Sequence, residues 1–313
     1  MDNKEFYRDN CPEWVPLFSH PLWLDFVCRD YWDVSLVLQN NNIKACMPYM
    51  VNNFERPTKI IMPKHTKFLG PYFKIEKDKT TSYITEENRL LRELESQLPP
   101  VKYYRQSWHP QFFNCMPFLT NKYQAKVKYC YILKNNKTYE EAWSMLDKDA
   151  RRLIRKAINN DTIITYNNDP EEFFSISNDI YKRQNIPNPY DFSFLKKLSL
   201  FIEKHKCGTM AFATVKNKPK DACLLVLYDN RSYYLFAGGA GVDSRGSGAV
   251  SLMIWEFVKK AVKYNTEFNF LGSSIQSKEQ FIRSFGGELV PYLDIFRENT
   301  LTKRVLRYFR IKL

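Results

Sequence analysis

The chain has 313 residues, of which 44% are hydrophobic and 16% aromatic, and its formal net charge is +13. This composition is typical of a globular protein with a substantial core and excludes a disordered or fibrous chain, and the length favours two domains or one large one. The positive charge favours anionic partners through long-range attraction. A genome rich in lysine and asparagine codons would produce the same excess without a basic function.

The cysteines and histidines give no sign of a metal or disulfide framework. The seven cysteines are scattered singly without a Cys-x-x-Cys pair, and the four histidines stand far apart. We therefore expect no metal site and no Ser-His-Asp or Cys-His hydrolase. Residues 1–5 are polar and do not resemble a signal peptide, and no apolar run reaches the roughly 18 residues of a membrane span. We expect a reduced, cytoplasmic protein.

The first part of the chain is predicted to mix helices and strands. Apolar residues at helical spacing predict helices, alternating ones predict strands, and the asparagine-rich turn at residues 40–42 predicts a hairpin. In chain order the expected elements are a helix at 20–30, strands at 32–38 and 43–49, a helix at 86–98, and strands at 103–108 and 126–133.

A single long helix is predicted over residues 137–159. Thr138 is a good N-cap, and glutamates follow it in the first turn. The second half is basic, because Arg151 and Arg155, like Arg152 and Lys156, lie one helical turn apart. Such a row is usually a solvated face, but it is also where a nucleic acid or a phosphate-bearing substrate would lie.

The second half of the chain continues the alternation. The order of strand, glycine-rich turn, helix and strand after residue 232 predicts a parallel pair of strands joined by a crossover helix. In chain order the expected elements are a strand at 162–166, helices at 170–184 and 192–204, strands at 209–215, 222–228 and 232–237, a helix at 249–262, a strand at 266–271, a helix at 278–285, a strand at 288–296 and a basic amphipathic helix at 301–313.

The turn at residues 238–248 contains five glycines and directly precedes a predicted helix. Bare backbone N–H groups at the positive end of a helix attract phosphate or carboxylate, and Arg245 adds a cation suited to a phosphate. The alternative is that the glycines only allow a sharp turn between a buried strand and a buried helix. No Gly-Lys-Ser/Thr follows, so the turn is not a P-loop.

Three segments of the second half resemble the Fem-type (FemABX) acyltransferases of the GNAT superfamily. They are the basic stretch at residues 152–157, Phe-Asn-Phe-Leu-Gly-Ser at 268–273, and Gln-Phe-Ile-Arg-Ser-Phe-Gly-Gly at 280–287. The resemblance extends from about residue 148 to residue 296. Asn269 departs from it by standing where the family often has an acid, the GNAT phosphate motif is matched only approximately, and the charged helical arm of some Fem enzymes has no counterpart.

This resemblance implies an α/β fold with mixed sheets, built from two GNAT-like subdomains that share a cleft and span residues 1–136 and 137–313. It implies an N-acyltransferase that moves an acyl or aminoacyl group from acyl-CoA (acetyl-CoA) or aminoacyl-tRNA to an amine, such as that of a cell-wall precursor. The imperfect loop counts against acyl-CoA, and the missing arm counts mildly against aminoacyl-tRNA. Between the two we expect acyl-CoA or another small activated donor. The alternative is a non-catalytic binding module of GNAT fold that recognises RNA or another polyanion.

The candidate site residues divide by role. Tyr234 and Glu267 are candidates for deprotonating the amine, although water would also serve. Tyr234 is equally well a core aromatic, and Glu267 is equally well a surface strand residue. The remaining candidates are Arg245, Gly246, Ser247, Gly248, Leu235 and Ala237 for the donor, and Lys278, Arg283, Arg151, Arg152 and Arg155 for the acceptor or tRNA.

Overall fold

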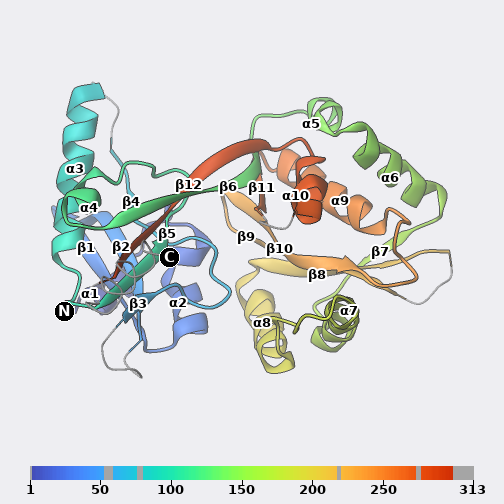
Figure 1. Cartoon of the computed structure of the whole chain (residues 1–313), viewed down its shortest axis with the longest axis horizontal. Coiled ribbons are helices and arrows are strands. Elements are labelled where there is room, and N and C mark those ends of the chain that lie inside the picture. Colours follow the sequence, from blue (N-terminus) through green and yellow to red (C-terminus); the bar gives the residue numbers. More distant parts are fainter. Residues whose placement is uncertain (1, 53–58, 76–79, 217–219, 273–275, 299–313) are drawn as a thin grey trace, which may run out of the picture. The chain divides into compact units, whose positions relative to one another are not determined.

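The computed structural model describes residues 2–52, 59–75, 80–216, 220–272 and 276–298 (Figure 1). It divides into two compact units, residues 1–128 with 291–313 and residues 129–290. The expected domain division after residue 136 stays a prediction. The expected helix at 301–313 lies outside the described residues. Within the described parts of the chain, no helix has the length and apolar character needed to cross a bilayer.

The first unit is a sheet with helices packed on it, and its strand order is β1-β2-β3-β5-β12 with β4 beside β2. Strands β1 and β2 form the hairpin expected from the sequence, while β12 runs antiparallel to β5. The elements are α1 (Asn3–Asn10), η1 (Leu17–Ser19), α2 (Pro21–Cys28), β1 (Trp32–Gln39), β2 (Asn42–Asn52), β3 (Lys59–Ile61), β4 (Tyr72–Phe73), α3 (Thr80–Ser96), β5 (Tyr103–Ser107), α4 (Met116–Thr120) and β12 (Glu288–Glu298).

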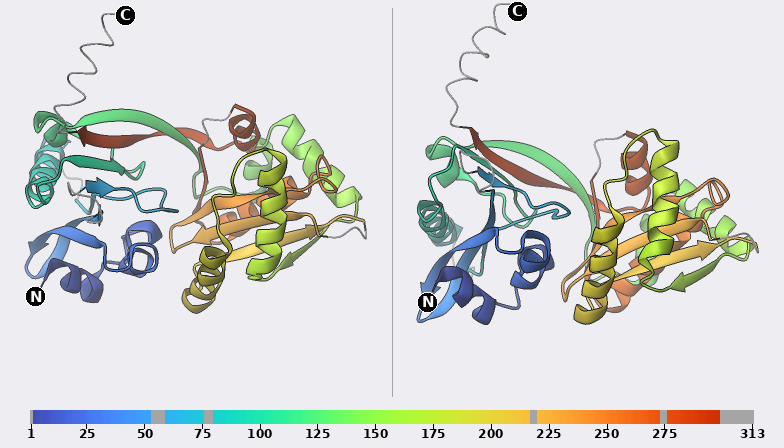
Figure 2. Two further views of the ribbon diagram at one scale, coloured as in Figure 1. Left: turned by 60° about the horizontal axis from the view of Figure 1, so that its bottom comes forward. Right: turned by 90° about the horizontal axis from the view of Figure 1, so that it is seen from below.

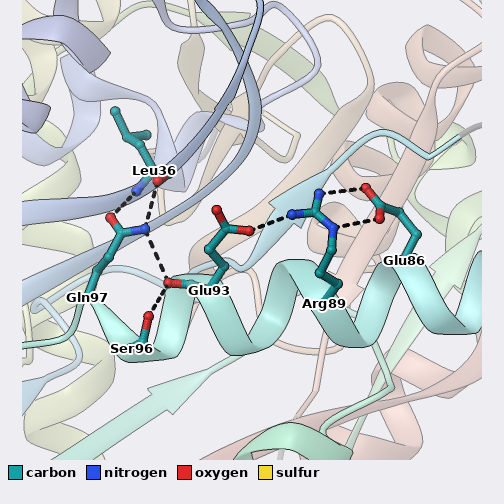
Figure 3. Close-up of polar contacts among 6 residues, drawn as sticks. All are labelled: Leu36, Glu86, Arg89, Glu93, Ser96 and Gln97. Atoms are coloured by element: carbon teal, nitrogen blue, oxygen red, sulfur yellow. Dashed lines mark hydrogen bonds and ion pairs between the residues drawn. The ribbon is translucent and has the colours of Figure 1, made fainter.

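Helix α3 is anchored to the edge strand β1 by one side chain. The Gln97 amide, just after the helix, donates from Nε2 to the Leu36 carbonyl oxygen at 2.8 Å and accepts from the Leu36 N–H at 3.1 Å (Figure 3). Farther up the same helix, Arg89 lies between Glu86 and Glu93. The amide therefore supplies the pair of hydrogen bonds that a further strand would give to Leu36.

The second unit has the strand order β6-β11-β10-β9-β8-β7. Strands β10 and β11 are parallel, which confirms the predicted parallel pair, and their neighbours in this unit pair antiparallel. The elements are β6 (Gln124–Leu133), α5 (Tyr139–Met145), α6 (Lys148–Asn159), β7 (Ile163–Tyr166), α7 (Pro170–Arg183), α8 (Phe192–His205), β8 (Gly208–Thr214), β9 (Ala222–Tyr228), β10 (Ser232–Ala240), α9 (Ala249–Lys263), β11 (Glu267–Leu271) and α10 (Gln276–Arg283).

Helices cover both faces of the sheet in the second unit. Helices α6 and α9 lie on one face, and α7 and α8 lie on the other (Figures 1 and 2). The hydrophobic cluster on the α9 face includes Tyr233, Phe268 and Phe270 from the parallel strands, packed against Phe257 of α9. Burying apolar side chains on both faces is what makes a sheet of this kind stable, at roughly 25 cal/mol per Å² of apolar surface. The mixed α/β class predicted from the sequence is confirmed.

The prediction of one continuous helix over residues 137–159 is wrong. Leu146 is extended, with ψ of 139°, and separates α5 from α6. Asp147 begins α6 as its N-cap by accepting a hydrogen bond from the Ala150 N–H at 2.7 Å. Its own N–H donates to the Ser284 carbonyl oxygen, which fixes the break against the segment after α10. Thr138 caps α5 as predicted, in a capping box with Glu141.

Candidate functional site

The parallel strands β10 and β11 pair over only three positions. Their register begins at Ser232 with Glu267 and ends at Tyr234 with Asn269. Beyond that point β10 continues to Ala240, paired on its other side with β9. Among the described residues, the edge of β10 that faced β11 has no strand partner after Tyr234, although the Phe236 carbonyl oxygen accepts a hydrogen bond from Tyr190 Oη at 3.3 Å. A strand edge without a partner strand can offer backbone hydrogen-bonding groups to a ligand.

Backbone irregularities accompany this divergence on both strands. The register between β10 and β9 shifts between Leu235 and Ala237, and the register between β11 and β6 shifts between Asn269 and Leu271. Bulges of this kind increase twist and bend a strand, and they often adjoin active sites. Leu271 has a φ of 59°, and its N–H donates to Oδ1 of the buried Asn269 at 2.8 Å. Asn269 thus holds the bend at the end of β11.

The loop between β10 and α9 is more internally bonded than the sequence indicates. Its N–H groups were expected to be bare, but five N–H groups between Gly241 and Ala249 have acceptors within the protein. They are Gly241 N–H to the Asp221 carbonyl at 2.7 Å, Ser244 N–H to Asp221 Oδ2 at 3.0 Å, Arg245 N–H to the Val242 carbonyl at 3.4 Å, Ser247 N–H to the Ser244 carbonyl at 3.2 Å and Ala249 N–H to Ser247 Oγ at 3.1 Å. Around residues 246–248 the expectation of bare N–H groups therefore fails at Ser247. The N–H groups of Gly246 and Gly248 have no acceptor among the described residues, and their role in binding a donor stays a prediction.

The start of α9 packs closely on the basic helix α6. A Cβ built on Gly248, at φ 89°, would lie 2.0 Å from the Leu153 carbonyl oxygen. Lys156 Nζ donates to the Gly246 carbonyl oxygen at 2.8 Å. A side chain at position 248 would collide with the backbone of α6, so the close approach of the two backbones requires glycine there. Lys156 and Arg245, the residue before Gly246, are both exposed.

The basic residues of α6 separate into two stripes. Arg151 donates to the Ser144 carbonyl oxygen, and the Arg155 guanidinium lies over the Trp143 ring, so this pair is directed toward α5. Arg152 is one turn from Lys156, on the stripe that reaches the glycine loop, and its side chain is 61% exposed beside Asp149. Lys156 contacts the loop at Gly246, next to Arg245 in the chain, and Arg152 lies one turn from Lys156. We call Arg152, Lys156 and Arg245 the loop-side cations, whereas Arg151 and Arg155 are directed toward α5.

The two predicted proton acceptors occupy different ends of the parallel pair. Tyr234 is at the last paired position and is 1% exposed. Glu267 is at the first paired position, where it forms an ion pair with Lys134 at 3.2 Å. Only Tyr234 lies where the strands diverge, and its catalytic role stays a prediction, as does that of Glu267.

A pair of hydrogen-bonded side chains that the sequence patterns do not predict lies beside the end of β11. Tyr131 of β6, whose partner in the register is Leu271, donates a very short hydrogen bond to Glu279 of α10. Arg283, one turn further along α10, pairs with the same carboxylate at 3.2 Å. Burial, together with the adjacent Glu279, raises the pKa of the Tyr131 phenol, so the phenol remains protonated at neutral pH.

The two predicted cations of α10 have separate surroundings. Arg283 belongs to the Glu279 pair, and Lys278 Nζ lies 6.0 Å from the centre of the Tyr181 ring of α7. Tyr131 and Glu279 are 148 positions apart, so no local pattern could have found them. The described residues contain no group of three or more His, Cys, Asp or Glu side chains placed to hold a metal ion.

No protein-family model and no curated protein sequence matches the chain. Solved structures do match. FemX is 9% identical with a TM-score of 0.68, over 98% of this chain and 97% of that one. L-PGS from Bacillus licheniformis is 8% identical with a TM-score of 0.54, and the C-terminal domain of a protein described as a lysylphosphatidylglycerol synthetase from Agrobacterium fabrum is 11% identical with the same TM-score, each over 98% of this chain and 95% of its own. The Fem-type fold expected from the sequence is confirmed.

Proposed function

We propose that the protein is an N-acyltransferase that moves an aminoacyl group from tRNA to a primary amine. The observation that carries this proposal is the divergence of β10 and β11 after Tyr234 and Asn269. An acyl group lying along the unpaired edge of β10 could be held by backbone hydrogen bonds while its carbonyl stays open to attack. N–H groups fixed in this way would also stabilise the oxyanion that develops on that carbonyl.

The choice of donor follows from the loop before α9. Acyl-CoA would need free amides for its phosphates, and five amides there already bond within the protein, which leaves those of Gly246 and Gly248 for a donor. The loop-side cations Arg152, Lys156 and Arg245 are instead solvent-exposed side chains, which suit the phosphate backbone of a polynucleotide. This favours aminoacyl-tRNA over acyl-CoA, in contrast to the preference drawn from the sequence.

The chemistry needs one nucleophile and one proton acceptor. The amine nitrogen attacks the ester carbonyl, a C–N bond forms, the C–O bond breaks and the ribose hydroxyl leaves with a proton. We assign to Glu279, whose side chain is 30% exposed, the role of accepting the proton that the amine loses and passing it to the leaving ribose oxygen, and to the Tyr131 phenol that of orienting the carboxylate. Tyr234 and Glu267 remain proposed contributors on the evidence of the sequence.

The acceptor is proposed from the family resemblance. The Fem-type segments imply the amine of a cell-wall precursor, and the similar structure described as a lysylphosphatidylglycerol synthetase carries a lipid in its name. We favour a lysine-containing peptide precursor, because the proposed reaction forms an amide from a primary amine.

The experiment compares two doubly substituted variants that differ in which stripe of α6 they change. Arg152→Gln with Lys156→Gln removes two loop-side cations, and Arg151→Gln with Arg155→Gln removes the same charge from the other stripe. Binding of the full-length protein to labelled aminoacyl-tRNA is measured at two salt concentrations, together with transfer of a labelled amino acid to a lysine-containing peptide. The first variant is expected to bind about tenfold more weakly, with a lower salt slope, and the second to change by less than about threefold.

Each other outcome has a defined meaning. Saturable acetyl-CoA binding without tRNA binding would reject the tRNA donor and support acyl-CoA. Binding of tRNA without transfer to any amine would support the non-catalytic binding module. Equal losses in the two variants would reject the loop-side cations as the donor surface, because net charge alone would then explain the binding.

A further inference from the structure

The segment that leads into and through α4 carries exposed apolar side chains that the proposed transfer does not use. Phe113, Met116 and Leu119 are 49%, 59% and 41% exposed. Met116 and Leu119 lie three positions apart in α4 and so share a face, while Pro117 and Phe118 of the same helix are buried. Large apolar residues scattered singly over a surface are ordinary, but a group of them marks a surface that binds a partner.

Helix α3 extends this surface, because α4 packs beside it (Figure 1). Asn114, just before α4, donates from Nδ2 to Asn88 Oδ1 of α3 at 2.9 Å. Residues one helical turn before and after Asn88 lie on the same stripe of α3. They are Ile84, which is 46% exposed, and Arg92, which is also exposed. The stripe therefore adds an apolar and a cationic side chain on the side of α3 that meets α4.

Two glutamates of α3 that contact the α4 segment are buried or nearly so, and both are hydrogen-bonded. Glu87 is 8% exposed and accepts from Asn114 Nδ2 at 2.9 Å. Glu95, with a side chain that is 13% exposed, accepts from Asn121 Nδ2 at 2.7 Å. Carboxylates held in this way are satisfied within the protein, so they present little negative charge to a partner on this side of α3.

Two further glutamates of α3 lie on the other side of the helix. Glu86 and Glu93 pair there with Arg89 (Figure 3). Because each residue turns the helix by about 100°, both glutamates are directed away from the stripe that meets α4. The exposed charges beside α4 are cations, namely Arg92 on α3 and Lys122, two residues after the end of α4. The surface therefore combines apolar side chains with positive charge.

We propose that this surface, which we call the α4 face, docks on an anionic lipid bilayer. Its members are exposed and either apolar or cationic: Ile84, Arg92, Phe113, Met116, Leu119 and Lys122. The apolar side chains enter the headgroup region and leave water, while the cations stay beside the lipid phosphates. Charge complementarity favours this partner, because each cation near an anionic membrane strengthens binding and the chain has a formal net charge of +13. Docking of this kind places the protein at a membrane surface whichever amine it modifies.

Flotation of the full-length protein with lipid vesicles tests the proposal. One set of vesicles contains phosphatidylglycerol and phosphatidylcholine in equal parts, and the reference set contains phosphatidylcholine alone. We expect binding to the anionic vesicles that weakens as salt is added, and binding to the reference set that is weaker by about tenfold or more. Absence of binding to the anionic vesicles, or equal binding to both sets, would overturn the proposal.

A substitution within the α4 face distinguishes docking there from attraction by net charge alone. Met116→Glu is expected to weaken vesicle binding by about tenfold or more, because a carboxylate then lies where an apolar group would enter the bilayer. Leu200→Glu in α8 is the matched control, since it makes the same change of charge at a helical position that is 62% exposed. Circular dichroism checks that both variants fold, and Phe113→Ser, which should also weaken binding, replaces Met116→Glu if that variant does not. Equal losses at the α4 face and at Leu200 would refute the face.

The cations of the face are tested by a second pair of variants. Arg92→Gln with Lys122→Gln removes two of them, and Lys196→Gln with Lys197→Gln removes two exposed cations from α8. We expect the first variant to bind anionic vesicles about tenfold more weakly and the second to change by less than about threefold. Analytical ultracentrifugation examines the other occupant of such a face, a second copy of the chain. A dimer that Met116→Glu dissociates, with vesicle binding unchanged in that variant, would assign the face to contact between copies and overturn the proposal.

Discussion

Lys156 of α6 donates a hydrogen bond to the carbonyl oxygen of Gly246 at 2.8 Å, and so joins the basic helix to the loop before α9. The donor in this contact is a side-chain ammonium, and the acceptor is a backbone carbonyl. The loop therefore presents a carbonyl to α6, while several of its amides bond internally. Anion binding at this place would depend on side-chain cations, which is the physical basis for favouring a tRNA donor.

The contact between the loop and α6 makes one glycine indispensable. In Gly248→Ala, the new Cβ would lie 2.0 Å from the Leu153 carbonyl oxygen at a φ of 89°. We expect a loss of about 3 kcal/mol or more in the free energy of unfolding, since backbone must move. Gly246→Ala is the matched control: its φ is 70°, but a Cβ there meets nothing within 4 Å, so about 1 kcal/mol is expected. Urea unfolding measures both, and equal losses would contradict the packing argument.

The pair formed by Tyr131 and Glu279 gives a prediction about activity. Glu279→Gln keeps the shape of the side chain but cannot accept the amine proton, so we expect transfer to slow by about 10²–10⁴. Arg283→Gln, which removes the ion pair at 3.2 Å and leaves the carboxylate, should slow it by less than about tenfold. Transfer rates are compared at saturating donor, with circular dichroism confirming the fold. A Glu279→Gln enzyme of full activity would remove Glu279 from the reaction.

Local patterns predicted most elements of this chain but not how the site is assembled. The helix at α9 and the parallel pair around it follow from apolar periodicity and the glycine turn, which act over a few residues. The division between α5 and α6 was missed because Asp147 is an N-cap inside a region of strong helical pattern. Whether loop amides are free depends on Asp221, which lies 23 residues before Ser244. Contacts of that span leave no periodic signal.

The amide of Gln97 gives a prediction about stability. It forms two hydrogen bonds with the backbone of Leu36. Leu36 lies in β1, which is the edge strand of the described sheet, so no further strand pairs with it on that side. Gln97→Ala should lower the free energy of unfolding by about 1–2 kcal/mol, because it leaves a partly buried N–H and carbonyl without these partners.

Arg89→Gln provides the control on the same helix. It removes two ion pairs, but the Arg89 side chain is 52% exposed, and exposed pairs contribute roughly 0–1 kcal/mol. Chemical denaturation of the two variants distinguishes them. If Arg89→Gln is the more damaging, the strand-edge contact does not anchor α3.

The Asp294 carboxylate gives a prediction about pH. Its pKa in the folded protein is below the ordinary value, since the hydrogen bonds from Arg105, Lys128 and Ser107 outweigh the opposing effect of burial. The folded state therefore binds this proton less readily than the unfolded chain does. The stabilisation is complete above the unfolded pKa of about 3.9 and is lost as pH falls through the lower folded value.

Asp294→Asn removes this contribution and leaves two cations facing an amide. At pH 7 we expect the free energy of unfolding to fall by about 1–3 kcal/mol. This range is modest because the Arg105 and Lys128 side chains are 48% and 32% exposed, so solvent screens their charges. The difference in the free energy of unfolding between the parent protein and the variant should narrow steadily below about pH 4, since protonation of Asp294 in the parent protein removes the same charge. Urea unfolding at pH 7, 5 and 3 measures the gap, and Asp9→Asn, at an exposed position, should show none. A gap of constant size across that range would mean that Asp294 acts through packing rather than through its charge.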